Sequence, residues 1–264
     1  MNNTFNIKRF GWLLKKTLLE KPVQMFGFTG LLLVLVPIVY ALLKSLSGYG
    51  AAQNITFVLG FSTGSFFLAS FVFGYFHSNA SGSSYLTLPA SHFEKWLCSI
   101  LIVGVLYPFI FLLFYHMVDS TFVAVYHRSL DPSSPFYKQQ YEAVYTVDIN
   151  GLFAWKVYSL SFFLTGAMLT GSLYFNKVAF IKVAIAITVI WGGAIVLNMV
   201  IAKMFFGKVN DSFPFGRVVI PVGREEGIIE LPANIINVVD YSVWYIVPAI
   251  LWLLAFTRLR EKEF

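Results

Sequence analysis

The residues best suited to covalent chemistry are a serine, a histidine and an aspartate in a strongly apolar chain. Residues 60–64 read GFSTG, which matches the G-x-S-x-G pattern around a nucleophilic serine, and His116 and Asp119 follow later. A group of Ser62, His116 and Asp119 would perform acyl transfer as an intramembrane hydrolase. That pattern needs a strand-to-helix turn, whereas GFSTG lies inside a predicted helix, where its two glycines more simply form a small-residue packing face.

Metal and nucleotide chemistry find little support in the residue pattern. His77 and His92 flank a short polar segment, but no third ligand accompanies them at the spacing of a zinc site. The single cysteine, Cys98, permits neither an internal disulfide nor a cysteine-based metal site. Glu225 and Glu226 lie in a predicted outer loop, which favours solvated charge over a protease pair. The chain has no G-x-x-x-x-G-K-[ST] loop, so we expect no catalytic residue, metal or cofactor in it.

The composition requires a membrane environment for the elements that position these residues. Of 264 residues, 58% are hydrophobic and 12% charged, and the mean hydropathy is +0.72. A bilayer core of about 30 Å needs about 20 apolar residues in a helix. Six stretches meet this length and predict an all-α membrane protein, with spans near 23–43, 55–76, 97–118, 152–175, 183–202 and 241–257. No acidic residue falls in these predicted span cores, which disfavours an ion-coupled carrier.

The distribution of basic residues predicts the orientation, because Lys and Arg near span ends concentrate on the cytoplasmic side. With a cytoplasmic N-terminus, the inner segments carry Lys8, Arg9, Lys15, Lys16, Lys21, Lys95, Lys177, Lys182, Arg258, Arg260 and Lys262. We therefore expect both termini inside and a bacterial inner-membrane location. The net charge of +6 fits contact with anionic lipid and gives no support for nucleic acid. The alternative in which the first span is a cleaved signal peptide is disfavoured by its long apolar run.

An interfacial helix is predicted before the first span, within residues 1–22. Residues 5–20 are amphipathic at helical period, and Pro22 should end the helix. The apolar side comprises Ile7, Phe10, Leu13, Leu14 and Leu18. The alternative is an ordinary basic flank.

Two outer loops are predicted, 119–151 and 203–240. In the second, the runs RVVIPV and GIIELP around GREE predict a β-hairpin that caps the outer face or contacts a substrate.

The segment 77–96 between the second and third spans is unusually polar, and the orientation makes it cytoplasmic. Ser91 and Glu94 match the S-x-x-E capping box, so a helix should start at Ser91 and continue into the third span. Pro89 disfavours helix at Leu88 and separates that helix from the preceding turn. A soluble partner could contact such a corner, although a plain, well-capped turn is the alternative.

The layout resembles the permease subunits of type-2 ABC exporters: a basic N-terminal helix, two spans, this cytoplasmic segment, four further spans and a charged tail. The matching residues are Gly82, Ser83, Tyr85, Leu86, Leu88, Pro89, Ser91, Glu94 and Lys95, with Ser84 among them. In that family this segment is the coupling helix, which docks on the ATP-binding subunit. Family members often carry an acidic residue just before the glycine, whereas HSNAS supplies none here.

The resemblance implies a non-catalytic permease subunit that works with a second copy or a related permease and with ABC ATP-binding subunits. Those partners would bind ATP and Mg, and their closure would press on residues 80–90 and open an outward path. The exported substrate would be hydrophobic or amphipathic. An accessory or structural membrane protein without transport is the alternative from a different class.

Overall fold

Among the residues that the structure describes, 80% are helical, and six helices are long and apolar enough to cross a membrane. The computed structural model describes residues 5–77, 79–175, 178–212, 214, 216–222, 225–230 and 232–262. Its α-helices are α1 (Ile7–Glu20), α2 (Phe28–Ser47), α3 (Tyr49–Val72), α4 (Asn79–Leu86), α5 (His92–Ile100), α6 (Tyr107–Ser129), α7 (Tyr137–Glu142), α8 (Leu152–Tyr174), α9 (Ala179–Phe206), α10 (Ala233–Tyr241) and α11 (Val247–Glu261). Three π-helical segments, η1 (Val23–Gly27), η3 (Leu101–Leu106) and η4 (Ser242–Ile246), and a 3₁₀ turn, η2 (Gly74–His77), complete the helical part. The predicted all-α membrane class is confirmed.

The six spans match the predicted ones in number but not in length. They are Val23–Ser47, Tyr49–Val72, His92–Ser129, Leu152–Tyr174, Ala179–Phe206 and Ala233–Glu261. The third span has 38 residues, about 57 Å at 1.5 Å per residue, so it projects well beyond a bilayer core. The prediction that a loop begins at residue 119 is wrong, because α6 stays helical to Ser129. Asp119 therefore lies in a helix.

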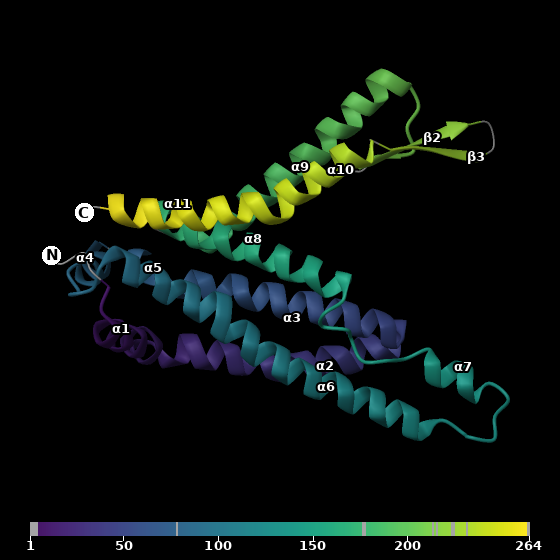
Figure 1. Cartoon of the computed structure of the whole chain (residues 1–264), viewed down its shortest axis with the longest axis horizontal. Helices are drawn as coiled ribbons and strands as arrows, with labels where there is room; N and C mark the ends of the chain where they lie inside the picture. The colour runs from purple at the N-terminus through teal and green to yellow at the C-terminus, as the bar shows by residue number, and fades with distance from the viewer. Residues whose placement is uncertain are drawn as a thin grey trace.

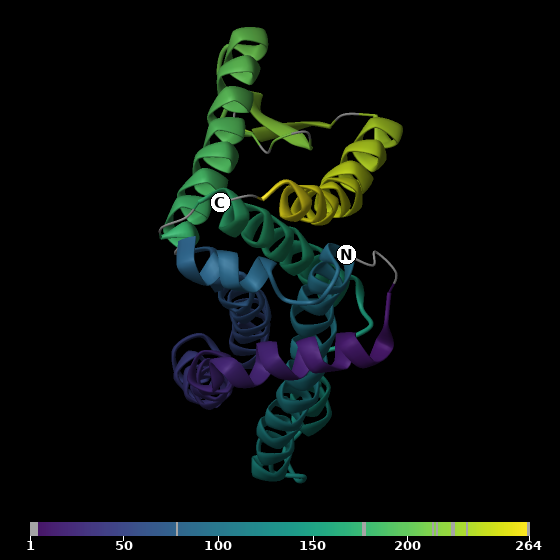
Figure 2. The same ribbon diagram turned by 90° about the vertical axis from the view of Figure 1, so that its left-hand side faces the viewer.

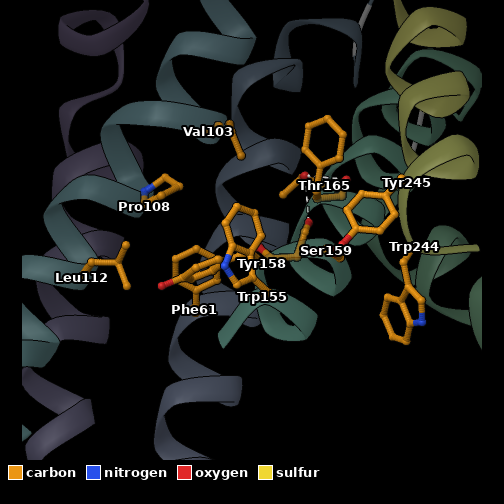
Figure 3. Close-up of a pocket in the computed structure, with 13 residues that line it drawn as sticks. Phe61, Val103, Pro108, Leu112, Trp155, Tyr158, Ser159, Thr165, Trp244 and Tyr245 are labelled. Atoms are coloured by element: carbon orange, nitrogen blue, oxygen red, sulfur yellow. Dashed lines mark hydrogen bonds between the residues drawn. The ribbon is translucent and has the colours of Figure 1, made fainter. Parts of the chain in front are cut away.

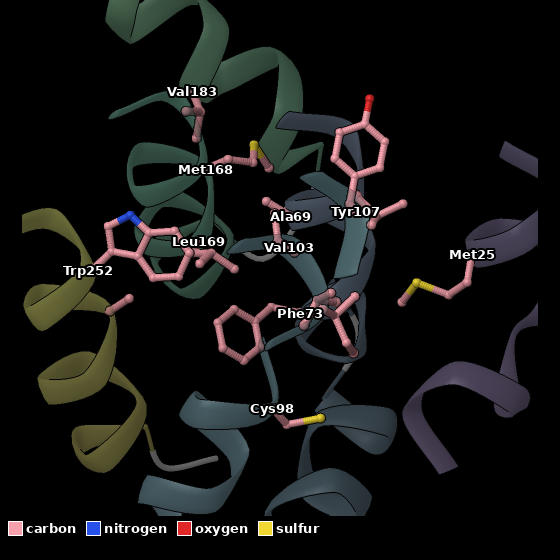
Figure 4. Close-up of a cluster of buried hydrophobic side chains, with 14 of the residues drawn as sticks. Met25, Ala69, Phe73, Cys98, Val103, Tyr107, Met168, Leu169, Val183 and Trp252 are labelled. Carbon is pink, nitrogen blue, oxygen red and sulfur yellow. The ribbon is translucent and has the colours of Figure 1, made fainter. Parts of the chain in front are cut away.

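The spans pack around α3, the most buried of the six, with α8 next (Figure 1). Figure 4 shows the centre of this core, where Phe73, directly after α3, meets Val103, Leu169 and Trp252 from η3, α8 and α11. By contrast, α2 and α9 leave most of their apolar surface outside the core. In a membrane protein, lipid or another membrane chain covers such surface.

One end of the bundle carries both termini, α1 and α4, while β2, β3 and α7 lie at the other (Figure 1). Figure 2 shows α1 lying across the first end, at a steep angle to the spans. On the predicted apolar side of α1, Leu13 is buried, and Phe10, Leu14 and Leu18 pack against the core. Ile7, at the first helical position, is 75% exposed.

The predicted hairpin is present as a small antiparallel sheet. Strand β2 (Arg217–Val222) pairs with β3 (Glu225–Glu230), with Val219 opposite Ile228. A short strand that the sequence did not predict, β1 (Asp211–Ser212), adds to the free edge of β2. The turn residues 223–224 lie outside the described part of the chain.

Glycines determine how closely the spans approach. Gly48 has φ +82°, a backbone conformation that suits glycine, and it forms the abrupt turn from α2 to α3. On α3, a Cβ at Gly60 would lie 2.6 Å from the ring of Phe111, and one at Gly64 would overlap Tyr107. The Tyr107 hydroxyl donates to the Gly60 carbonyl across the same contact, at 2.6 Å. GFSTG is therefore a close packing surface between α3 and α6.

We expect Gly64→Ala to destabilise the protein by about 1–3 kcal/mol, because the added methyl group must displace the Tyr107 ring in a packed core. Thermal unfolding of the purified protein in detergent should show this as a clear decrease in Tm. Gly50→Ala on the same helix is the matched control, since a Cβ there meets nothing within 4 Å. Equal Tm values for the two variants would contradict the close α3–α6 contact.

Candidate functional site

The candidate site is the α4–α5 corner, which we define as α4, the turn 87–90 and the first turn of α5. The capping box predicted from sequence forms: the Glu94 N–H donates to Ser91 Oγ at 3.2 Å, and the Ser91 N–H donates to Glu94 Oε2 at 2.8 Å. These bonds satisfy backbone donors that the start of a helix would otherwise leave unpaired. A new helix thus begins directly after Pro89.

Glu94 also binds a second segment, which the capping box alone does not predict. Its fully buried carboxylate accepts hydrogen bonds from Arg9 Nε at 2.8 Å and Arg9 Nη2 at 2.7 Å. The Asn6 N–H adds a bond of 2.8 Å at the start of α1. The hydrogen bond to Glu94 is also the main reason why the pKa of Arg9 is raised. One carboxylate therefore fastens α1 to the corner.

Lys95 fastens the other side of the corner. Its buried side chain crosses back to α4, where Nζ donates to the Leu86 carbonyl at 2.9 Å and lies 5.5 Å from the centre of the Tyr85 ring. A cation at a helix C-terminus satisfies an unpaired carbonyl and is stabilised by the helix dipole. The two adjacent residues of α5 thus connect it to two different helices: Glu94 binds α1 and Lys95 binds α4.

Tyr85, one of the residues that the resemblance assigns to the partner contact, lies inside the chain. It is 3% exposed and stacks on Tyr75 with ring centroids 4.6 Å apart. The Tyr75 hydroxyl donates to Glu20 at the end of α1. Burial raises the pKa of both phenols, so each remains neutral at ordinary pH. Packing against Tyr75 and Phe76 of η2 and against Lys95 of α5 leaves no face of Tyr85 for a partner.

Other residues of the corner remain accessible. Ser84, Thr87 and Pro89 are exposed, and Ser83, Leu86 and Leu88 are partly so. By contrast, Gly82, Ser91, Glu94 and Lys95 are buried within the chain. The residues predicted to contact a partner therefore fall into two groups, one on the surface of the corner and one buried beneath it. The sequence alone does not show to which group each residue belongs.

The structure gives no support to the hydrolase hypothesis for Ser62, His116 and Asp119. In the described residues no hydrogen bond joins these three side chains: Ser62 Oγ is buried without a partner, and His116 is exposed. Asp119 is buried and accepts from the Tyr40 hydroxyl at 2.9 Å, Gln53 Nε2 at 2.9 Å and the Val147 N–H at 2.7 Å. These bonds join α2, α3 and the loop between α7 and α8 to α6, so Asp119 has a structural role that sequence reasoning missed.

Metal chemistry likewise finds no centre in the part of the chain that the structure describes, where no three His, Cys, Asp or Glu side chains come together. The side chains of His77 and Glu225 lie outside that part. Glu226 is exposed and accepts a hydrogen bond from Asn210 at 3.2 Å.

No protein-family model, curated protein or solved structure matches this chain. Function is therefore inferred from its residues and their contacts.

We expect Glu94→Ala to lower the free energy of unfolding by about 1–3 kcal/mol, because it leaves the partly exposed Arg9 guanidinium and the N–H groups of Asn6 and Ser91 without their acceptor. Ser91→Ala removes one helix cap and should cost about 1 kcal/mol. The matched control is Glu142→Ala, which breaks an exposed pair with Lys138 and should cost about 0–1 kcal/mol. Chemical denaturation followed by circular dichroism would rank the three. A cost for Glu94→Ala no larger than that for Glu142→Ala would contradict the fastening role.

Proposed function

We propose that this chain is the membrane-spanning subunit of an ATP-driven ABC transporter, with ATP and Mg bound by a separate subunit. The observation that carries the proposal is the firm attachment of the α4–α5 corner to both the N-terminal helix and the third span. A partner that presses on the corner would move these elements together, because Glu94 and Lys95 connect them through partly buried hydrogen bonds.

The position of the corner supports this proposal. It lies at the end of the bundle that carries both termini, and the basic-residue pattern makes that end cytoplasmic (Figure 1). An ATP-binding subunit works in the cytoplasm, so the corner is accessible to such a partner. Its exposed residues, Ser84, Thr87 and Pro89, are small enough to let the backbone approach a groove closely.

The largely uncovered surfaces of α2 and α9 suit a second permease copy as well as lipid. In the proposed transporter, two permease chains enclose the path, and closure of the ATP-binding subunits drives alternating access. Export from the bacterial cytoplasm, the direction implied by the resemblance, would carry a hydrophobic or amphipathic substrate outward.

We expect Ser84→Arg and Thr87→Arg to reduce by at least tenfold the ATPase activity that accompanies the tagged chain when it is purified from its native membrane. A bulky cation on the exposed side of the corner should block docking while leaving the buried supports intact. Gln139→Arg, equally exposed at the opposite end of the bundle, is the control and should retain the activity. The absence of an ATP-binding chain from the wild-type preparation, or full activity in both corner variants, would overturn the proposal and favour an accessory membrane protein.

The proposed orientation has its own test. In a Cys98→Ser background, cysteines at Lys138 and Glu226 should react with an impermeant thiol reagent applied to intact cells lacking an outer membrane barrier, whereas a cysteine at Thr87 should not. All three positions are exposed, so a difference in labelling reports the side of the membrane. Labelling of Thr87 from outside would reverse the orientation and remove the corner from the cytoplasm.

A further inference from the structure

A cavity of about 380 Å³ lies between α8, η4 and the third span (Figure 3). Its volume is within the usual range for small-molecule sites. Aromatic rings form much of the wall: Phe61, Trp155, Tyr158, Phe162, Trp244 and Tyr245. Along α8 the lining runs from Trp155 to Thr165, about 15 Å at 1.5 Å per residue, so the space suits an elongated apolar group.

A second space of about 220 Å³ adjoins the first and has a different chemistry. The two share Trp155, Ser159, Trp244 and Tyr245 as wall residues. The second also contains a cation, Lys156 on the first turns of α8, and an anion, Asp240 near the end of α10. Within the described residues no ion pair joins Lys156 to Asp240, although both face this space.

Two serine side chains in the wall of the aromatic cavity have hydroxyls without a protein partner in the described residues. Ser159 is 8% exposed and Ser161 is 4% exposed, and in the described part of the chain neither hydroxyl makes a hydrogen bond. The neighbouring Thr165 differs, because its hydroxyl bonds the Ser161 carbonyl at 2.9 Å within its own helix. Buried polar groups are normally paired, and an unpaired hydroxyl in an apolar wall is available to a ligand.

The walls of this cavity depart from regular helix. Val103 and Gly104 come from η3, directly before Pro108, while Trp244 and Tyr245 come from η4, shortly before Pro248. Proline lacks the N–H that would continue an α-helical ladder, and π-helical turns occur frequently at functional sites. Such turns shift the following side chains off the α-helical period and keep the walls apart.

We propose that the two joined spaces bind a single-chain zwitterionic amphiphile. Its apolar chain occupies the aromatic cavity, its cationic group faces Asp240 and the rings of Trp244 and Tyr245, and its anionic group faces Lys156. Aromatic faces attract organic cations, which strengthens the binding of a quaternary or primary ammonium. A purely cationic head would meet repulsion from Lys156, and a purely anionic head from Asp240, so the charges select a head with both signs.

Binding of an amphiphile in these two spaces does not depend on transport. That the bound amphiphile is the transported substrate rests on the proposed function. In the proposed orientation the charged mouth faces the outer side, because α8 begins after the outer loop. A head group would then lie near the outer membrane surface with its chain directed toward the bilayer centre.

The test compares three 12-carbon probes that differ only in the head group: dodecylphosphocholine, dodecyltrimethylammonium and dodecyl sulfate. Each is titrated below its micelle concentration into the full chain in phosphatidylglycerol nanodiscs, and binding is followed by tryptophan fluorescence, with empty nanodiscs as blank. We expect saturable binding of dodecylphosphocholine by the wild type. Comparing each probe across protein variants removes its general partitioning into the bilayer.

Two charge variants should shift the head-group preference in opposite directions. Asp240→Asn should weaken the binding of dodecylphosphocholine about tenfold and strengthen the binding of dodecyl sulfate. Lys156→Gln should weaken the binding of dodecylphosphocholine and strengthen the binding of dodecyltrimethylammonium. The controls are Asp131→Asn and Lys138→Gln, the same changes at exposed positions in the other outer loop. They should leave the binding of all three probes unchanged. Circular dichroism confirms that each variant is folded.

Absence of saturable binding, or the same head-group preference in all variants, would show that the cavity is a packing gap and would overturn the proposal. This assay contains no ATP-binding chain, so its outcome is separate from that of the transport test. Charge-dependent binding by a chain that never accompanies an ATPase would leave the site in place and remove only the transport role.

Discussion

The buried carboxylate of Glu94 is the group on which the end of the bundle that carries both termini depends. A carboxylate removed from water is stable only if charge and hydrogen bonds replace its hydration. Here the guanidinium of Arg9 and the backbone N–H groups of Asn6 and Ser91 provide both. Because these donors come from α1 and from the start of α5, the requirement of one side chain fixes how these two segments lie against each other. The orientation of α1 across the bundle end follows from this constraint as much as from its amphipathic surface.

The sequence predicts the features that depend on local spacing or on bulk hydropathy. The capping box at Ser91 requires only a serine and a glutamate three residues apart, and the spans require only apolar length. The hairpin follows from two β-branched runs around a polar turn. Each of these features is decided within a few neighbouring residues, so no knowledge of distant contacts is needed.

Long-range contacts explain the remaining differences. Arg9 has the spacing of a polar-face residue that contacts lipid, and its pairing with Glu94 across 85 positions has no local signature. Asp119 lies beyond the apolar run, so hydropathy ends the third span before it, although packing against Tyr40 and Gln53 extends the helix to Ser129. Tyr85 has the residue type of a binding contact, and stacking on Tyr75 places it inside. The aromatic cavity likewise depends on which residues meet across helices.

The third span connects these long-range features. Buried carboxylates fix it near both ends, Glu94 to α1 and Asp119 to α2 and α3, while its π-helical segment η3 borders the aromatic cavity between them. A helix held at both ends transmits a displacement along its axis more readily than one held by apolar contacts alone, because hydrogen bonds to a buried charge resist sliding. Under the proposed function, a push at the α4–α5 corner therefore reaches η3, where the helical ladder is irregular and the wall of the cavity is easiest to reshape. The arrangement links a surface suited to a soluble partner with a space suited to an amphiphile through one continuous element.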